Sequence, residues 1–359
     1  MKILITGVGG PTPRSFAIAL KKYSPYREVE LIGTDSNVLS VGLYQKDLFD
    51  KSYVVPPADA EEYWEVVEDI VRENNIGMAV VLPEQEVLAW CARDETAGLP
   101  CKSLLPHSRL AEVLVDKGKM TDLLAASGLV PPSMAFSRNE ADFEHLFDVL
   151  GDDFWVRSAS GTSGLGSLRV DSKATLRNWM QINPDVTDFL ASKYLAGRNL
   201  ACKLLYYEGA LLRAATAERV EYIMAKVAPS GITGNTSFGR LLNEPELVSV
   251  AVRAMDIIFE AVDVKKHGFF TVDFKEDLDG RPYLTEVNVR HVAFTQCFAA
   301  GGANFAADTI DLLRGASDFD RNFKIYEFEK DLIFLRDVDV IPVLMKETEL
   351  LKDYKRLML

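Results

Sequence analysis

Short apolar runs alternate with amphipathic stretches over about the first 105 residues. The pattern predicts a strand at 2–7, a helix at 14–22, a strand at 29–37, a helix at 60–75 and a strand at 77–83. Strands that alternate with helices are typical of a parallel, doubly wound sheet. Such sheets bind ligands beyond the carboxyl ends of their strands, and glycines or acidic residues end these runs. We therefore expect a ligand crevice at this edge.

From residue 110 onward, antiparallel strands dominate the pattern. Amphipathic helices are predicted at 111–128 and 246–262. Short apolar runs predict strands at 154–157, 168–170, 189–194, 201–206 and 210–214 and a hairpin at 269–288. From residue 320, a tail of short strands is expected to pack back on the body. The second region is therefore expected to be α+β, so that the whole chain combines α/β and α+β organisation.

The composition narrows the function classes. The 359 residues carry 53 acidic and 40 basic side chains, and the net charge of −13 opposes non-specific binding to nucleic acid or to an anionic membrane. No apolar stretch approaches the roughly 18 residues of a membrane-spanning helix, and the first residues lack the pattern of a signal peptide. The four cysteines and four histidines show neither CxxC nor HExxH spacing. We expect a soluble, cytoplasmic protein without a zinc ribbon or a disulfide framework.

The glycine-rich segment GVGG at 7–10 has two interpretations. It follows a predicted strand and precedes a predicted helix, as the phosphate loop of a nicotinamide-binding fold does. However, the third glycine of GxGxxG is absent, and Pro11 and Pro13 are expected to disturb the helix start. A tight turn between strand and helix needs the same glycines and is the other interpretation. A nicotinamide-dependent Rossmann oxidoreductase therefore stays as an alternative function.

A second glycine-rich segment follows a predicted strand in the middle of the chain. The strand ends on Arg157, and residues 158–166 read SASGTSGLG. Backbone N–H groups in such a loop form a nest for an oxyanion, and an arginine can hold phosphate oxygens with two hydrogen bonds. A surface hairpin with a loose tip explains the loop equally well.

The segment 268–290, GFFTVDFKEDLDGRPYLTEVNVR, predicts an acidic hairpin. With a two-residue turn at 279–280, Asp273 faces Glu286 directly, and with a four-residue loop the two are diagonal neighbours. In either register Asp273, Glu286 and Asn288 share one face, roughly 5–8 Å apart. Two carboxylates this close repel each other unless a cation lies between them, and such oxygen ligands favour Mg²⁺. A solvated strand face with chance acids is the alternative interpretation.

The cation, the glycine loop and the acidic hairpin, in this order, imply a nucleoside triphosphate with Mg²⁺. With these features the chain resembles the ATP-grasp superfamily over nearly its whole length, especially the split-gene relatives of the carbamoyl-phosphate synthase large subunit and of biotin carboxylase. The matching segments are VDKGKMTDLLAASGLVPP, FWVRSASGTSGLGSLRV, FLASKYLAGRN and TVDFKEDLDGRPYLTEVNVR. The resemblance implies a Rossmann-like preATP-grasp domain at 1–107, a linker helix and small lid subdomain at 108–192, a carboxyl-terminal ATP-grasp subdomain at 193–319 and a tail at 320–359.

The resemblance also implies roles for single residues. Asp273, Glu286 and Asn288 would bind the metal ion, and Arg157 and Arg290 would be the catalytic cations that act on the transferred phosphoryl group. The implied nucleotide contacts are Lys117, Arg157, Ser160, Gly161, Ser163, Gly164, Gly166, Lys193, Tyr194, Leu195 and Asn199.

Two departures concern the ribose of the nucleotide. Ser192 stands where many members of the superfamily have a glutamate, and the acid that others carry near Asn199 is absent. The ribose hydroxyls are therefore expected to bind Asn199 or Ser192.

The reaction that the resemblance implies is transfer of the γ-phosphoryl group of ATP to a small carboxylate, giving an acyl phosphate for attack by an amine. ADP and phosphate are then released. The expected cofactors are ATP and Mg²⁺, with Mn²⁺ as the alternative ion, and a homodimer is left open. The acceptor pocket is expected between the strand ends of the first domain and residues 220–239, with the candidate contacts Glu86, Arg219, Thr236 and Ser237. A non-catalytic ATP-grasp-like partner protein is a further alternative function.

Overall fold

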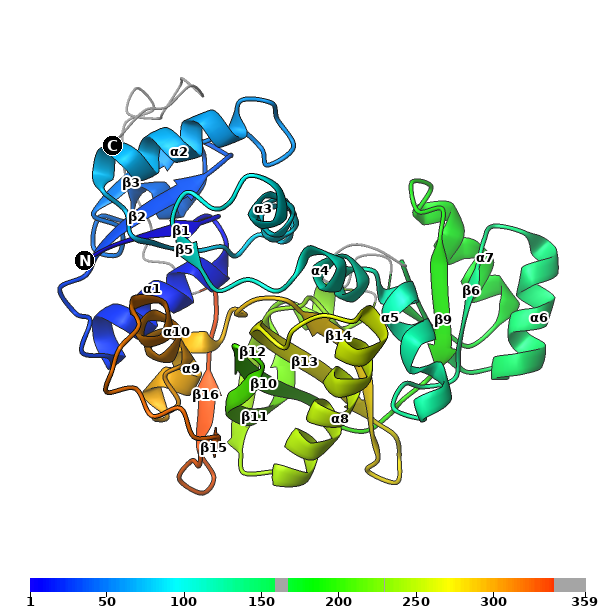
Figure 1. The fold of residues 1–359 in the computed structure, drawn as a ribbon. Coiled ribbons are helices and arrows are strands. Elements are labelled where there is room, and N and C mark those ends of the chain that lie inside the picture. The colour runs from blue at the N-terminus through cyan, green and yellow to red at the C-terminus, as the bar shows by residue number, and fades with distance from the viewer. Residues whose placement is uncertain (159–166, 229, 339–359) are drawn as a thin grey trace.

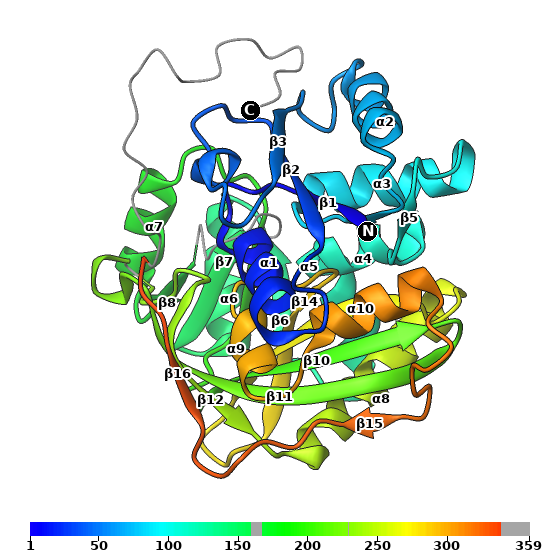
Figure 2. The same cartoon turned by 90° about the vertical axis from the view of Figure 1, so that its left-hand side faces the viewer.

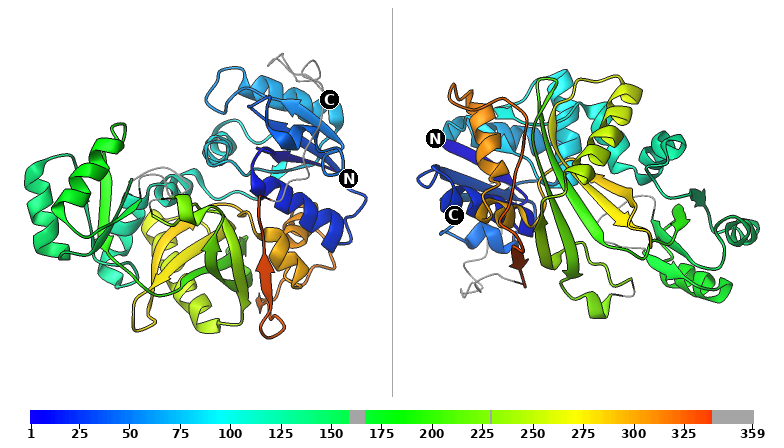
Figure 3. Two further views of the ribbon diagram at one scale, coloured as in Figure 1. Left: turned by 180° about the vertical axis from the view of Figure 1, so that it is seen from behind. Right: turned by 90° about the horizontal axis from the view of Figure 1, so that it is seen from below.

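A computed structural model describes residues 1–158, 167–228 and 230–338 of the chain. Over these residues the chain forms a five-stranded, a four-stranded and a seven-stranded sheet (Figure 1). Helices pack on all three sheets, which confirms the predicted combination of α/β and α+β organisation. The four-stranded sheet and its helices lie to one side of the other two, as the view from behind also shows (Figure 3). None of the described helices has the length and hydropathy that crossing a bilayer requires.

The amino-terminal sheet has the strand order β3-β2-β1-β4-β5, and all its pairs are parallel, as the alternating pattern predicts. Its strands are β1 (Lys2–Thr6), β2 (Glu30–Asp35), β3 (Lys51–Val54), β4 (Met78–Val80) and β5 (Lys102–Ser103). β1 is buried along most of its length because helices cover both faces of the sheet.

The helices of this sheet come from both ends of the chain. They are α1 (Pro11–Tyr23), α2 (Tyr63–Asn74) and α3 (Glu84–Thr96), joined by α9 (Thr295–Ala300) and α10 (Phe305–Arg314), which pack against α1 (Figure 2). The expectation that Pro11 and Pro13 disturb the start of α1 is wrong. α1 begins at Pro11, because a proline in the first turn gives up an N–H that has no partner within the helix.

The single helix predicted at 111–128 is two helices, α4 (Ser108–Val115) and α5 (Lys117–Leu124). Asp116 separates them, because its backbone is extended and its side chain accepts a hydrogen bond of 3.0 Å from the backbone N–H of Lys119. The amphipathic period continues across the break, so the pattern alone predicts one helix. The break makes Lys117 the first residue of α5, where it is buried.

The four-stranded sheet has the order β6-β9-β7-β8, and all its pairs are antiparallel. Its elements are β6 (Ser133–Phe136), α6 (Glu140–Leu150), β7 (Phe154–Ser158), β8 (Leu168–Val170), α7 (Lys173–Ile182) and β9 (Phe189–Lys193). Its apolar side chains form a core of their own, separate from the cores of the other sheets. This sheet, which we call the lid sheet, therefore packs as an independent layer.

The seven-stranded sheet has the order β14-β13-β10-β11-β12-β16, with β15 beside β11. Its strands are β10 (Asn199–Tyr207), β11 (Ala210–Tyr222), β12 (Thr236–Leu242), β13 (Gly268–Glu276), β14 (Pro282–Asn288), β15 (Lys324–Ile325) and β16 (Ile333–Leu335), and α8 (Pro245–Val262) packs on one face. β11 runs well beyond its predicted end at 214. In the region of the expected tail, β15 pairs with β11 and β16 pairs with β12, and residues 339–359 lie outside the described part.

Candidate functional site

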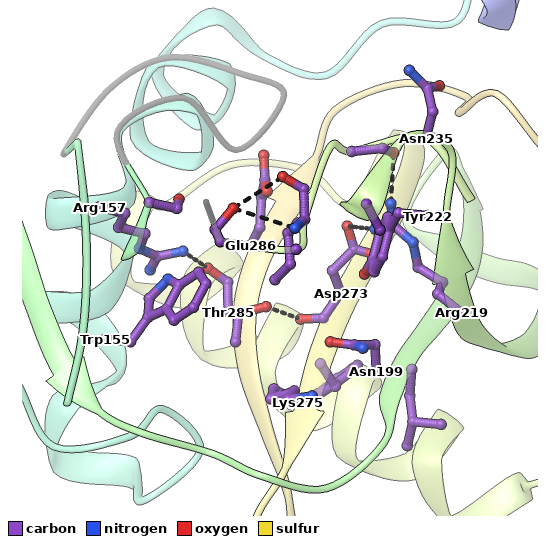
Figure 4. A pocket seen from close by; sticks show the side chains of 18 of the residues that line it. Trp155, Arg157, Asn199, Arg219, Tyr222, Asn235, Asp273, Lys275, Thr285 and Glu286 are labelled. Carbon is purple, nitrogen blue, oxygen red and sulfur yellow. Dashed lines mark hydrogen bonds and ion pairs between the residues drawn. The ribbon is translucent and has the colours of Figure 1, made fainter. Parts of the chain in front are cut away.

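A cavity of about 860 Å³ lies between the lid sheet and the seven-stranded sheet (Figure 4). Residues of β7 and β9 line it on the lid side, and residues of β13 and β14 line it on the opposite side. The end of β11 with the segment that follows it, together with the first residues of α1, completes the lining. All three sheets or their helices therefore contribute to one cavity.

The acidic hairpin faces this cavity. Asp273 on β13 is directly opposite Glu286 on β14, as the register with the shorter turn predicts. The turn itself differs from both expectations, because the Asp277 N–H donates to the Arg281 carbonyl (3.1 Å) and Gly280 between them has φ +78°. A register shift next to Asp273 compensates for this longer turn, so the acids still face each other.

The Asp273 carboxylate is buried and only partly hydrogen-bonded. Its Oδ2 accepts hydrogen bonds from Asn288 Nδ2 (3.3 Å) and from Arg219 Nη1 (3.1 Å), whereas its buried Oδ1 has no partner among the described atoms. Burial raises the pKa of Asp273 to about 6; the Arg219 charge opposes this rise, and the Glu286 charge adds to it. An acid with an unpaired oxygen beside a second acid is an arrangement that a cation would stabilise.

Asp273, Glu286 and Asn288 fit a Mg²⁺ ion by the chemistry of their donors. Oxygen ligands are the ones that this ion prefers, and it is usually bound by one or two carboxylates together with substrate phosphates. No group of three or more His, Cys, Asp or Glu side chains that could hold a metal occurs in the described ranges. The protein would therefore supply two carboxylates and an amide, and the ligand and water would supply the remaining oxygens.

Four cationic side chains line the cavity around these acids, namely Lys117, Arg157, Arg219 and Arg290. Lys117 Nζ lies 3.8 Å from Glu286 Oε1. Arg157 Nη1 donates to the Thr285 carbonyl (2.8 Å), and its buried Nε has no hydrogen-bond partner among the described atoms. Burial lowers the pKa of Arg290, and the charges of nearby acids, Glu84 first, oppose this shift. The cavity thus combines the facing acids with these cations, as a bound polyphosphate would require.

The predicted nucleotide contacts outside the glycine loop also line the cavity. Lys193, Tyr194, Leu195 and Asn199 do so, together with Ser192, which pairs with Trp155 across β7 and β9. The loop residues Ser160, Gly161, Ser163, Gly164 and Gly166 lie outside the described residues. Both candidate ribose ligands, Ser192 and Asn199, are therefore within the cavity.

The four predicted acceptor contacts have different surroundings. Arg219 lines the cavity, but its guanidinium also donates to Thr236 Oγ1 (3.0 Å) and to the Gly234 carbonyl (2.6 Å). Thr236 is fully buried and is not a lining residue, and neither is Ser237. Arg219 therefore contacts Asp273 directly, whereas Thr236 contacts Arg219 from outside the cavity lining.

Glu86, the fourth predicted contact, is not in the cavity. It is buried beside the amino-terminal sheet, where its Oε1 accepts a hydrogen bond from the Tyr63 hydroxyl (2.8 Å) and burial raises its pKa to about 7. The acid that lies near the cavity cations is Glu84, since Arg290 and Lys117 oppose the rise in its pKa that burial causes. Residues two apart on a helix point in different directions, so only one of these two acids lies near the cavity.

Lys203 is a buried cation that the sequence analysis missed. It is completely buried on β10, where Nζ donates to Thr295 Oγ1 (3.2 Å) and lies about 5 Å from the ring centre of Phe294. Burial lowers its pKa to about 7. A lysine flanked by apolar residues in a predicted strand was the signal that could have identified it.

The GVGG segment makes a tight turn. A β-carbon at Gly7 would lie 2.2 Å from the Pro83 side chain, and one at Gly9 would lie 2.3 Å from Ser40 Oγ. The Gly9 N–H donates to Asp35 Oδ2 (2.8 Å), so the acid at the end of β2 holds this turn. Packing and hydrogen bonding within the protein thus account for these glycines without a dinucleotide.

Comparison with known proteins shows which of them this chain is similar to. No protein-family model matches it. It is 25% identical to the D-alanine--D-alanine ligase of Neisseria meningitidis serogroup B over 211 residues, which are 56% of this chain and 67% of that protein.

Many solved structures share the fold, including the following two. The N5-carboxyaminoimidazole synthetase of Staphylococcus aureus, complexed with ADP, matches with a TM-score of 0.69 and 14% identity over 93% of this chain and 81% of its own. The L-amino acid ligase of Bacillus licheniformis matches with a TM-score of 0.62 and 18% identity over 87% and 74%. Together with the arrangement of the cavity, these similarities confirm the resemblance to the ATP-grasp superfamily, whose fold this chain has.

Proposed function

We propose that this protein is an ATP-dependent ligase that activates a small carboxylate as an acyl phosphate and joins it to an amine, releasing ADP and phosphate. The observation that carries the proposal is the facing pair Asp273 and Glu286, which lines one cavity together with cations that include Lys117, Arg157 and Arg290. The similar proteins named D-alanine--D-alanine ligase and L-amino acid ligase support a carboxylate–amine reaction.

The side chains of the cavity account for phosphoryl transfer without a nucleophilic residue. Asp273, Glu286 and Asn288 would hold Mg²⁺, which when bound supplies positive charge to the transferred phosphoryl group and the β-phosphate. Arg290, directly after β14, would neutralise the acceptor carboxylate and the acyl phosphate that forms from it. Arg157 on β7 and Lys117 at the start of α5 would hold the phosphates from the other side.

The two steps balance without a further reactant. The acceptor carboxylate oxygen attacks the γ-phosphorus of ATP, and the bond to the β,γ-bridging oxygen breaks, so that ADP leaves. The amine then attacks the acyl carbon, phosphate leaves with its electron pair, and the amine loses one proton. The protein's contribution is therefore to position the reactants and to neutralise charge.

The proposal is tested by the fate of a labelled oxygen. A panel of amino acids and other small carboxylates, each enriched in oxygen-18 in the carboxyl group, is incubated with Mg²⁺ or Mn²⁺, ATP and hydroxylamine. We expect ADP, a hydroxamate of the accepted acid, and one labelled oxygen in the released phosphate. Label recovered in AMP would contradict the proposal, because it would mean attack at the α-phosphorus.

A further inference from the structure

Residues 223–228 and 230–235 form the described part of the segment between β11 and β12, and several of them line the cavity beside Arg219. Its ends are fixed to each other, since the Ile223 N–H donates to the Asn235 carbonyl (2.7 Å). Arg219 connects these ends to the acidic hairpin, because its guanidinium donates hydrogen bonds to both the Gly234 carbonyl and the Asp273 carboxylate. The side chains of this segment that line the cavity are therefore held at a set position relative to the acidic pair.

Two apolar side chains of this segment line the cavity although they are not covered by the protein. Met224 is 65% exposed, and its φ of +56° is a conformation that residues other than glycine seldom adopt. Ile232 is partly exposed as well. Exposed apolar side chains beside a polar cavity are typical of a surface that a ligand covers.

The residues after Arg290 provide further apolar side chains to the cavity. Val292 and Phe294 line the cavity, and Phe294 is buried and stacks on Phe334 with ring centres 5.7 Å apart. Tyr222 is also a lining residue, and its ring lies 4.9 Å from the Arg219 guanidinium. A carboxylate held at Arg290 would therefore have the apolar side chains of both segments in the same cavity.

We infer that the acid activated by this site carries an apolar side chain, and that Met224 and Ile232 contact it. The inference rests on the proposed function, and it names the substrate class of the same cavity. The charged residues of this stretch that line the cavity, Glu221 and Lys226, are exposed, so that water screens any pair they form with a substrate. An apolar side chain, in contrast, gains by covering Met224 and Ile232.

The test compares four amino acids that differ in the side chain. ADP release with Mg-ATP and hydroxylamine is measured for L-alanine, L-leucine, L-phenylalanine and L-glutamate. We expect kcat/KM for leucine or phenylalanine to exceed that for alanine by at least about tenfold, the discrimination that a few methylene groups provide. Met224→Lys should reduce this ratio about tenfold, and Ile232→Ala should act in the same direction.

The matched control is Val227→Lys. Val227 is 71% exposed on the same segment but does not line the cavity, so the ratio should stay as in the wild type. Equal rates on all four acids would overturn the inference. So would a preference for glutamate that is lost in Lys226→Met.

A failure of the proposed function gives a different result, namely no ADP release with any of the four acids. In that case, calorimetric titration of leucine and glutamate into protein loaded with MgADP tests the preference for an apolar side chain without requiring turnover. Tighter binding of leucine that Met224→Lys weakens and Val227→Lys does not would support it. Equal binding of both acids, or binding of neither, would overturn it.

Discussion

The guanidinium of Arg219 and the carboxylate of Asp273 form an ion pair of 3.1 Å that spans three strands. Arg219 belongs to β11 and Asp273 to β13, and on β10 between them Ala201 pairs with Asp273 itself. The small side chain of Ala201 leaves room for the arginine to reach across. Asp273 therefore has a counter-charge before any metal ion is bound.

Arg219→Met removes this counter-charge and leaves Asp273 buried beside Glu286. We expect the free energy of unfolding without metal to fall by on the order of 3 kcal/mol. Mg²⁺ should then raise the melting temperature of the variant more than that of the wild type, because the ion replaces the lost charge. Thermal unfolding with and without MgCl₂ measures both effects, with Arg219→Lys as the charge-conserving control. The same response to Mg²⁺ in wild type and Arg219→Met would contradict the assignment of Asp273 as a metal ligand.

Asp273→Asn and Glu286→Gln remove one negative charge each with little change in shape. Both variants should fold. Glu286→Gln should be as stable as the wild type without metal, or more stable, because the two acids no longer repel each other. Asp273→Asn also loses the ion pair with Arg219, so its stability without metal should be lower than that of Glu286→Gln. ATP turnover should fall at least about a hundredfold if these acids hold the metal ion. Asp279→Asn at the exposed tip of the same hairpin is the control and should keep wild-type turnover. Near-normal turnover in both site variants would rule out the proposed metal site.

Glu86→Gln tests whether this acid has only a structural role. The pKa of Glu86 is about 7 in the folded protein, above the usual 4.5, so the native state binds the extra proton between these values. The contribution of this group to stability is therefore present below pH 4.5 and is lost as the pH rises through 7. The variant should gain stability relative to the wild type from pH 5 to pH 8, in urea unfolding at each pH, with unchanged KM values. A raised KM for the acceptor acid would contradict this and would indicate that Glu86 contributes to substrate binding.

Gly42→Ala tests the packing that holds the GVGG turn. A β-carbon at Gly42 would lie 2.0 Å from the Val8 carbonyl oxygen, which is backbone and has little freedom to move. We expect a loss of about 1–3 kcal/mol in the free energy of unfolding, as for other overpacked positions. A β-carbon at Gly77 would meet nothing within 4 Å, so Gly77→Ala is the control. Equal stability of the two variants would show that the backbone at Val8 can move to make room for a β-carbon at Gly42.

The facing of Asp273 and Glu286 could be predicted from the sequence because side chains alternate along a strand, and two strands joined by a short turn leave few registers. Which of Glu84 and Glu86 lies near Arg290 could not be predicted from the sequence. Both acids are in the first turn of α3, and the orientation of this helix about its axis decides which of them lies near the cavity. The function of Lys117 was predicted from the resemblance, whereas the helix break that positions it depends on the cap at Asp116.

Long-range pairing explains most of the remaining differences. The far half of β11 pairs with β12, whose residues follow after a long connection, and its own sequence gives little sign of this partner. The ion pair of Arg219 depends on the same pairing, because it needs β11 to extend past residue 214. Local patterns thus predict elements and registers within hairpins, but not contacts that only the assembled sheet creates.

The packing of α9 and α10 against α1 has a consequence for the order in which the chain can assemble. Gln296 donates a backbone hydrogen bond to Ser15 Oγ, and these residues are 281 positions apart in the sequence. The apolar side chains of α10, such as Ile310, belong to the same core as those of β1. During synthesis the amino-terminal sheet therefore leaves the ribosome with one face covered only by α1, until α9 and α10 have also been made. We expect this sheet to need protection by chaperones for that time, and a fragment that ends at residue 107 to aggregate rather than fold.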